Sequence, residues 1–372
     1  MDRTLRVRLP GADIPGVTVD TRPDTRALEP LSAVLAAEWA VLADEVAADP
    51  FSRPEWTRAW AATIGAEPLV ATVRRAGRLT AAYPMIRGRG RALRSAADWH
   101  TPHLDVVGDA GSATALVAGV VAQSRRITFD FASGVTADGA RRALGEARFL
   151  ARERVRLSSP WIDLAAGWEA YRDSIPSRKW REIRRRHRRL EEEGQVGYSE
   201  HDGRTDLDRL LTAGFAVEGS GWKEVSGSAV RSDPRVEEFY RRVAGWAAER
   251  GMLRLHFLRL DGRPIAFDLA FVANGAEWLL KTGFDPSLFA FSPGSLLRAE
   301  VLEQAFAAGL GRYEFLGAAA PWKLEWTDLT RDVVIIDGFA PGVAGRIGMV
   351  GAKVARRIQI ARRRNQAPGP SG

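Results

Sequence analysis

The sequence contains no cysteine. This excludes disulfides, metal sites built on thiolates and a cysteine nucleophile. Its apolar runs, such as residues 113–122, are far shorter than the roughly 20 residues that cross a bilayer. The start of the chain is interleaved with arginine and lacks the apolar centre of a secretory signal. We therefore expect a cytoplasmic protein.

The motifs of several common catalytic mechanisms are also missing. There is no Gly-x-Ser-x-Gly elbow, no phosphate-binding P-loop and no dinucleotide-binding glycine fingerprint. Asp98, His100, His103 and Asp105 are metal-ligand types, but Pro102 interrupts their spacing and no second cluster supports them. We interpret these four residues as structural or substrate-lining and expect no metal.

The composition indicates a globular protein with two domains. A chain of 372 residues exceeds the size at which one core stops growing, and an apolar share of 45% excludes wholesale disorder. Helical and strand patterns alternate along the chain, which predicts layered α/β domains. We expect one domain at residues 1–165, a second at 166–340, and a basic helix with a disordered tail at 341–372.

The positive charge is concentrated in two segments. Residues 177–193 contain eight Lys or Arg and four Glu, and residues 346–364 contain seven Lys or Arg and no acid. Together they carry +11, whereas the whole chain carries +8. Such segments could face phosphates, a nucleic acid or a membrane surface, or could be solvated faces raised in arginine by a GC-rich bacterial genome.

The first half shows four helical and three strand patterns. Residues 30–65 read as two helices broken near Asp49, and Ala76-Gly77 marks a hairpin between strands at 69–74 and 78–86. Helices at 113–123 and 138–149 flank a strand at 127–132.

The second half begins with an arginine-rich helix and continues with a meander. Ser177 is the expected N-cap of a helix that Gly194 ends. A further helix spans 235–250, and strands at 253–260, 263–273 and 277–283 are joined by Asp-Gly and Asn-Gly turns. A helix then runs from the Ser292-Pro293-Gly294 turn to about residue 308, before a strand at 312–316.

Three local clusters could carry chemistry. The turn at Ser292, Gly294, Ser295 and Leu296 opens a helix whose N-terminus could hold a phosphate, although it could also be a plain cap. Lys323, between two tryptophans after a strand, could stabilise an oxyanion or simply lie over an aromatic surface.

The third cluster is the run Glu218-Gly-Ser-Gly-Trp222-Lys223. Glu218 is a candidate general base for an attacking ammonium, directly or through a water. The same glycine-rich run could be a plain connector. Lys281 and Asp285 flank the end of the third meander strand and could orient donor or acceptor.

Residues from Ser177 to Trp326 resemble, in order, the CelD-like acyltransferases of the GNAT superfamily, whose fold is similar to that of Fem-type peptidoglycan aminoacyltransferases. The resemblance rests on the arginine-rich helix, the Glu218 to Lys223 run, Leu260-Asp-Gly-Arg-Pro-Ile-Ala266, Lys281-Thr-Gly-Phe-Asp285, Ser292-Pro-Gly294 and Trp322-Lys323. The runs Asp49-Pro-Phe51-Ser-Arg-Pro-Glu-Trp56 and Tyr83-Pro-Met85 resemble the family's first half more loosely.

The resemblance implies two GNAT-like α/β (α+β) domains, each a mixed, largely antiparallel sheet flanked by helices. It implies a donor near residues 292–296 and a reaction at splayed strands beside Lys281 and Lys323, with Glu218 and Asp285 as further catalytic residues. Trp222, Lys223 and Trp322 are then the expected substrate-binding residues. Lysine at the position of Lys323 matches a Fem-type residue that stabilises the developing oxyanion.

Two donors and one non-enzymatic alternative follow. Our first expectation is transfer of an acyl group, acetyl in the first place, from acyl-CoA to an amine acceptor. The usual GNAT pyrophosphate loop is absent and Fem-type relatives use aminoacyl-tRNA, so a charged tRNA is the second candidate donor. The third interpretation is an inactive binding protein whose basic C-terminal helix makes weak contact with a membrane surface.

Overall fold

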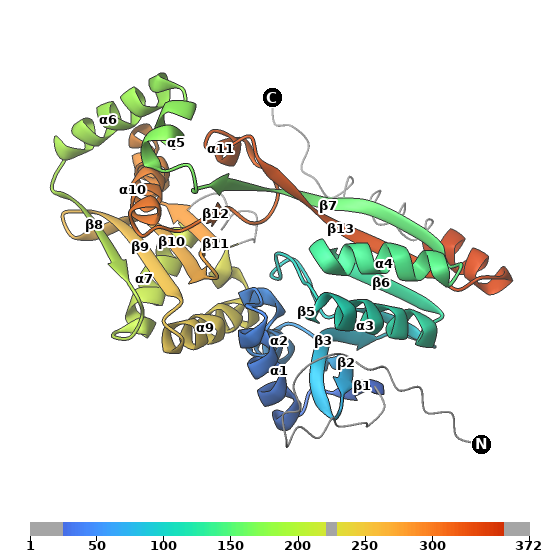
Figure 1. Cartoon of the computed structure of the whole chain (residues 1–372). Coiled ribbons are helices and arrows are strands. Elements are labelled where there is room, and N and C mark those ends of the chain that lie inside the picture. Colours follow the sequence, from blue (N-terminus) through green and yellow to red (C-terminus); the bar gives the residue numbers. More distant parts are fainter. Residues whose placement is uncertain (1–24, 221–228, 353–372) are drawn as a thin grey trace, which may run out of the picture.

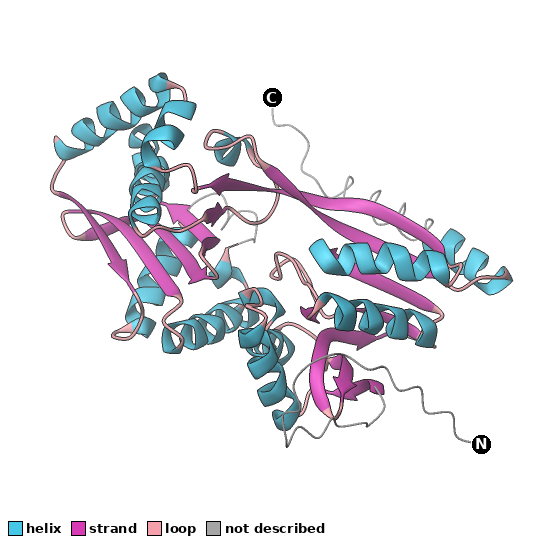
Figure 2. Ribbon diagram, in the orientation of Figure 1, coloured by secondary structure: helices cyan, strands magenta, loops and turns pink. Residues whose placement is uncertain are grey.

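The computed structural model describes residues 25–220 and 229–352. Within them the strands form one continuous sheet in the order β1-β2-β3-β4-β6-β13-β7-β12-β11-β10-β9-β8, with β5 paired to β3. Helices cover both ends of this sheet (Figures 1 and 2). No helix in these ranges is long and apolar enough to span a bilayer.

The first half confirms the expected alternation of helices and strands. A side-chain cap starts α3, because Asp109 accepts from the amide of Ser112 at 2.9 Å. The elements are β1 (Thr25–Pro30), α1 (Ala33–Glu45), η1 (Pro50–Ser52), α2 (Pro54–Thr63), β2 (Leu69–Arg75), β3 (Arg78–Arg87), β4 (Ala92–Ser95), β5 (Val107–Gly108), α3 (Ala110–Gln123), β6 (Arg126–Ala132) and α4 (Gly134–Glu146).

The two halves share the centre of the sheet. The long strand β7 (Leu150–Asp163) pairs with β13 (Thr330–Phe339), and β13 also pairs with β6. The last strand of the chain therefore returns to the first half, where Val333 and Ile336 join its core. The domain boundaries at 165/166 and 340/341 stay a prediction.

The second half contains the predicted meander. Asn274 and Gly275 have φ of 54° and 69°, the left-handed pair that a two-residue hairpin turn requires. The elements are α5 (Trp168–Ser174), α6 (Ser177–Glu191), β8 (Val196–His201), α7 (Leu207–Gly219), η2 (Val230–Ser232), α9 (Pro234–Glu249), β9 (Leu253–Leu260), β10 (Arg263–Ala273), β11 (Ala276–Phe284), η3 (Pro286–Phe291), α10 (Pro293–Ala307), β12 (Arg312–Glu314) and α11 (Pro321–Leu324). The fold class is confirmed: two α/β halves with largely antiparallel strands flanked by helices.

One capping prediction is wrong. Pro176 occupies the N-cap position of α6, and Ser177 is its first helical residue without a capping bond. The Ser177 hydroxyl instead accepts from Arg181 at 3.0 Å. Pro176 has an extended ψ of 127°, so the chain enters the helix one residue earlier than the serine signal suggests.

A cluster of buried aromatic side chains also joins the two halves. Phe51 and Trp56 of the first half are buried against Phe239 of α9 and Trp278 of β11. Their ring centroids lie 5.0 to 5.5 Å apart in edge-on pairs, a geometry worth about 0.5–1.5 kcal/mol each beyond burial. This core holds α9, and with it one side of β11, against the first half.

A buried ion pair fixes α10 on the sheet. Arg298 of α10 lies 2.6 Å from Asp268 of β10, with side-chain exposures of 2% and 1%. We expect Arg298→Met to lower the free energy of unfolding by about 3–5 kcal/mol, because Asp268 loses its closest counter-charge while it stays buried. Urea denaturation measures the change.

The double variant Asp268→Leu/Arg298→Met should recover most of that loss, since no charge then remains buried at this position. Arg141→Met is the control, because its 2.7 Å pair with Glu153 is partly exposed and should contribute less than about 1 kcal/mol. Equal effects of Arg298→Met and Arg141→Met would contradict the anchoring role.

Candidate active site

The strands β11 and β12 diverge, as the resemblance implies. They run parallel and pair over residues 276–278 and 312–314. Beyond Trp278, the strand pairing of β11 in the described part of the chain is with β10. The chain after β12 turns toward β7, where the amide of Phe315 donates to the carbonyl of Pro160 at 3.1 Å. The second half of β11 therefore presents an edge that β12 does not pair.

Two predicted residues meet on the side of this edge that α7 and α9 cover. Lys281 Nζ lies 4.6 Å from the ring centroid of Tyr240 on α9. Glu218 of α7 is 2% exposed, and its Oε2 accepts from the amide of Val230 at 2.9 Å. A Cβ on Gly283 would lie 2.4 Å from the Cα of Glu218, so glycine at this point of β11 lets α7 approach. The candidate base is thus buried and held by a backbone amide.

Lys323 organises the loop that follows β12. Its Nζ donates to the carbonyl of Leu316 and, at 3.1 Å, to that of Ala318. Gly317 has φ of 59°, the conformation that folds the loop back toward the ammonium. Trp322 beside it is 39% exposed and packs edge-on against Phe315. A structural role for Lys323 therefore accompanies the predicted oxyanion role.

The predicted donor turn combines one side-chain cap, made by Asp285, with a contact from an arginine of α6. Asp285 caps η3 by accepting from the amide of Ser287 at 3.0 Å, and pairs with Arg263 at 2.6 Å. Burial opposes its ionisation, but the hydrogen bonds from Ser287 and Arg263 outweigh burial and lower the pKa of Asp285. Ser292 has φ of 49°, and its hydroxyl accepts from Arg186 of α6.

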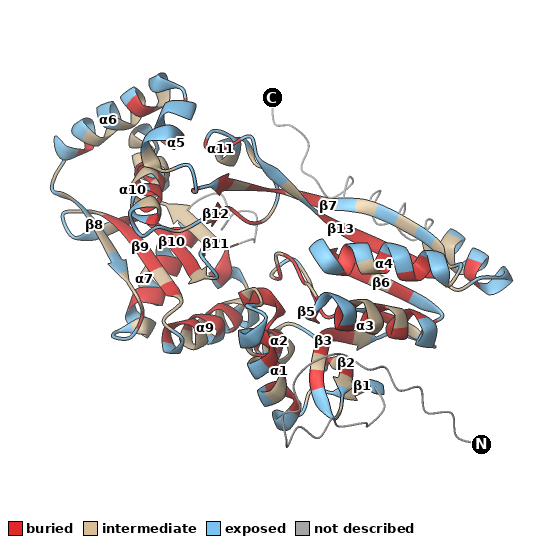
Figure 3. Cartoon of the chain, viewed as in Figure 1, coloured by how far each residue is buried: buried red, intermediate tan, exposed pale blue. Residues whose placement is uncertain are grey.

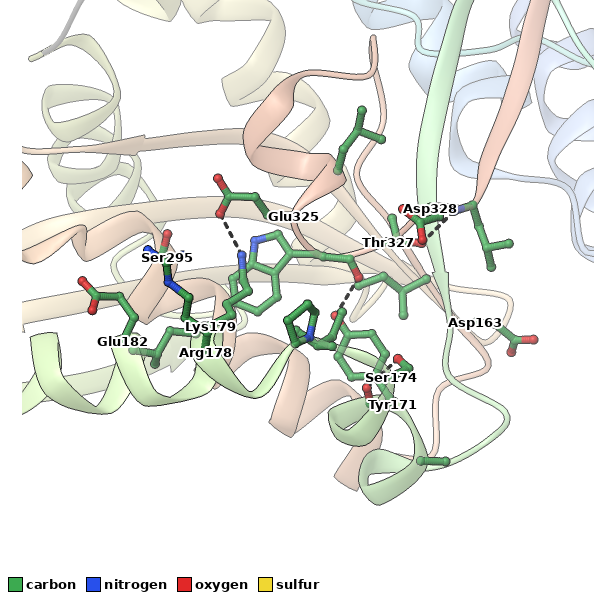
Figure 4. Close-up of a pocket in the computed structure, with 18 of the residues that line it drawn as sticks. Asp163, Tyr171, Ser174, Arg178, Lys179, Glu182, Ser295, Glu325, Thr327 and Asp328 are labelled. Atoms are coloured by element: carbon green, nitrogen blue, oxygen red, sulfur yellow. Dashed lines mark hydrogen bonds and ion pairs between the residues drawn. The ribbon is translucent and has the colours of Figure 1, made fainter.

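A cavity of about 1050 Å³ lies beside the start of α10. Ser295 and Leu296 line it, as do residues of α5, α6 and the segment 324–329. Gly294 lies against Phe284, the last residue of β11. In Figure 4, Ser295, Glu182 and Lys179 lie at one end of the cavity and Asp163 and Asp328 toward the other. The donor turn and the arginine-rich helix therefore share one pocket.

Most basic residues of α6 face solvent, but one lysine turns inward. Lys179 Nζ lies 2.8 Å from Glu325 and 3.9 Å from the ring centroid of Trp326. Burial lowers the pKa of Lys179, against the raising effect of Glu325. The exposed residues, which make up the predicted positive stripe, are Arg178, Arg181, Arg184, Arg185, Arg188 and Arg189 (Figure 3).

The predicted site residues thus fall on two sides of the C-terminal sheet. Figure 1 shows α5, α6 and α10 on one side and α7 and α9 on the other. The donor turn lies with the first group, and Glu218 and Lys281 lie with the second. Trp222 and Lys223 lie outside the described residues.

Sequence reasoning missed Tyr240 and the inward orientation of Lys179. The helical period placed Tyr240 within an amphipathic helix but did not indicate that its ring would contact the ammonium of Lys281. The period of α6 indicated a buried stripe through Trp180 and Leu190, which are buried. It did not show which neighbouring cation would lie against the pocket.

The four residues considered as metal ligands have other partners. His103 Nε2 lies 3.0 Å from Asp49, and Asp105 accepts from the hydroxyl of Ser133 at 2.6 Å. The amide of His100 donates to Asp98 at 2.9 Å. In the described ranges no group of three or more His, Asp or Glu side chains is arranged to hold a metal ion.

The comparisons identify the class of the second half. Residues 177–324 match the family model described as acetyltransferase (GNAT) domain. This match confirms the resemblance for the segment from α6 to α11, the part that contains the diverging strands. The chain therefore contains an acetyltransferase (GNAT) domain at residues 177–324.

Solved structures of similar fold cover most of the chain. FemX aligns with a TM-score of 0.56 and 11% identity over 81% of this chain and 95% of that one. A domain described as the C-terminal domain of a putative lysylphosphatidylglycerol synthetase from Agrobacterium fabrum aligns with a TM-score of 0.55 and 13% identity. The alignment covers 86% of this chain and 96% of that one. A conserved protein of unknown function from Bacteroides thetaiotaomicron VPI-5482 aligns with a TM-score of 0.54 and 12% identity, over 85% of this chain and 100% of that one. At these identities the likeness concerns the fold, and no curated protein matches the chain.

The buried His103–Asp49 pair gives a pH dependence of stability. Burial disfavours charged His103, but the hydrogen bond and charge of Asp49 outweigh burial and raise the pKa of His103. A raised folded pKa stabilises the protein fully below the unfolded value of about 6.5 and loses this contribution as pH rises through the folded value. The free energy of unfolding of the wild type in urea should therefore fall as pH rises above about 6.5.

His103→Gln is the comparison, because it removes this titration and keeps the pH response of the other buried histidine, His256. The wild-type curve of unfolding free energy against pH should fall more steeply than that of the variant. Parallel curves would show that His103 does not bind its extra proton in the folded state.

Proposed function

We propose that the protein is an N-acyltransferase that moves an acyl group, acetyl in the first place, from acyl-CoA to an amine by direct attack in a ternary complex. The observation that carries this proposal is the divergence of β11 and β12. The two faces of the sheet at this point have different side chains. The side with α10 has a pocket that three cations and four carboxylates line, and the side with α7 and α9 has a carboxylate and a lysine. A thioester between the strands could therefore meet a donor site on one side and an acceptor on the other.

The donor side suits a phosphorylated carrier. Arg178, Lys179 and Arg186 line the pocket together with Ser295. Amides in the first turn of a helix and the positive end of its dipole favour phosphate oxygens. The volume of about 1050 Å³ is at the upper end for small-molecule pockets and is adequate for part of a CoA molecule.

The acceptor side suits an amine. Glu218 and the ring of Tyr240 lie beside the part of β11 that β12 does not pair. Lys323, at the end of the loop after β12, would stabilise the oxyanion that forms when nitrogen attacks the thioester carbon. The nitrogen forms the new C–N bond, and the thiolate of CoA leaves as the C–S bond breaks.

Aminoacyl transfer from a charged tRNA is the second candidate, favoured by the exposed arginine stripe of α6. Its stronger form requires both basic helices to face one site. The second basic segment, residues 346–364, lies in a helix that begins at residue 343, just after β13. Figure 1 shows that β13 ends at the side of the molecule opposite to α6. The described part of this segment therefore does not join the pocket, and most of the segment, with any membrane contact it makes, lies outside the described residues.

Ligand binding tests the donor first. We expect calorimetry to show micromolar binding of acetyl-CoA to the full chain, because the pocket supplies volume for the carrier and places cations beside a helix N-terminus. Filter retention of a charged tRNA pool at two salt concentrations is the parallel measurement. Tight tRNA binding that weakens steeply with salt, without a CoA signal, would overturn the acyl-CoA donor.

Lys323→Ala tests the oxyanion role. We expect turnover to fall by roughly 100-fold, in line with the loss of one oxyanion donor. Because Nζ also holds the loop at Leu316 and Ala318, the KM for acetyl-CoA and thermal unfolding are measured beside kcat. A lower kcat with unchanged KM indicates a transition-state contact. Unchanged kcat in the folded variant would refute the role.

A further inference from the structure

A histidine of the first half lies near the part of β11 that β12 does not pair. Its ring nitrogen Nδ1 lies 3.2 Å from the hydroxyl of Tyr240, and the ring of Tyr240 also contacts the ammonium of Lys281. The histidine is His100, which precedes the buried Thr101 in a short turn. It is half-buried, and its Nε2 has no hydrogen-bond partner among residues 25–220 and 229–352.

The turn that carries His100 is anchored on both sides. Asp98 accepts from the amide of His100 at 2.9 Å, and Trp56 Nε1 donates to the hydroxyl of Thr101 at 3.3 Å. Trp99 lies edge-on to Phe131, with the guanidinium of Arg156 4.1 Å from the Trp99 ring centroid. A side chain on such a braced turn is held in place before substrate arrives, which catalytic groups require.

The charges around His100 favour its neutral form. Burial lowers the pKa of His100, and the nearby ammonium of Lys281 lowers it further. The carboxylates of Asp98 and Asp233 act in the opposite direction but do not outweigh these effects. Burial raises the pKa of Tyr240, so its hydroxyl keeps its proton beside His100.

We propose that His100 is the general base of the reaction and accepts a proton from the acceptor ammonium at Nε2. The role requires the tautomer in which Nδ1–H donates to the oxygen of Tyr240, which leaves the Nε2 lone pair for the acceptor. Tyr240 is then a positioning residue. This inference rests on the proposed N-acyl transfer and replaces Glu218 in the role of base, because that carboxylate is 2% exposed and bonded to the amide of Val230.

The step balances without another reactant. An ammonium acceptor gives one proton to Nε2, and the freed lone pair forms the C–N bond to the thioester carbon. As the C–S bond breaks, the departing thiolate takes the second nitrogen-bound proton and leaves as the free thiol. The third proton stays on the amide nitrogen, and the imidazolium of His100 returns its proton to water.

The first test needs no acceptor. Nitrogen-15 NMR of the histidine rings in the full chain, assigned with His100→Gln, reports the tautomer and the titration of His100. We expect protonated Nδ1, bare Nε2 and a midpoint below that of an exposed histidine. A ring protonated at Nε2, or an imidazolium at neutral pH, would overturn the proposal.

The second test is kinetic. Release of CoA thiol from acetyl-CoA is followed with glucosamine, spermidine and L-lysine as probe amines. We expect His100→Ala to lower kcat/KM by about 100-fold or more and to remove the acidic limb of its pH profile. Tyr240→Phe should shift that limb, which a role in packing alone would not do. His201→Ala is the matched control, because His201 lies on β8 at the edge of the sheet, bonded to Ser199.

The outcomes separate this inference from the proposed function. Normal turnover with an unchanged pH profile in His100→Ala would overturn the base and leave acyl transfer standing. If the wild type releases no thiol and binds no acetyl-CoA, N-acyl transfer from CoA fails, and the assignment of His100 fails with it.

Discussion

The parallel pairing of β11 with β12 is the constraint on which the site depends. Parallel neighbours need a crossover, and α10 supplies it on one side of the sheet. After β11 the short helix η3 leads directly into α10, so the part of β11 that β12 does not pair and a helix N-terminus are neighbours by connectivity. The buried Arg298–Asp268 pair holds α10 in this position from within the core. Desolvation makes such a pair a poor source of net stability, so its effect is to fix one arrangement.

The second constraint is the way the halves are joined. β13 inserts between β6 and β7, so the sheet is continuous through the middle of the molecule. Phe51 and Trp56 then bring the first half against α9 and Trp278. Because of these two contacts, a turn near residue 100 can reach Tyr240, 140 residues away in sequence. The first half thus contributes side chains next to the edge strand of the second.

Local signals explain what could be predicted from the sequence. Asn274-Gly275 and Asp261-Gly262 require left-handed backbone, so the three meander strands were predicted within a few residues of their observed bounds. The helix after Ser292-Pro293-Gly294 follows from proline at its first position. The start of α6 was one residue off, because Ser177 is a good cap by type but follows a proline that already takes the N-cap position.

The site was only partly predictable, because its contacts join distant parts of the chain. Glu218, Lys281 and Lys323 were named by their motifs, but their neighbours Tyr240, Val230 and Leu316 follow from tertiary packing. The return of β13 to the first half has no local signal at all, since an apolar strand pattern does not specify its partner. His100 shows the same limit. Its spacing from His103 suggested one cluster, but in the structure His100 contacts Tyr240 and His103 contacts Asp49.

The arrangement of charge across the sheet gives the two sides different chemistry. On the α10 side, three cations and four carboxylates line a pocket beside a helix N-terminus, and phosphate is favoured where the cations and the positive end of the helix dipole lie together. On the α9 side, Lys281 lies on an aromatic face beside the half-buried His100, where its charge disfavours a second cation. An acceptor ammonium that enters there meets the same repulsion, which falls when the ammonium gives up its proton. The lysine therefore favours the neutral amine, the form that attacks a thioester.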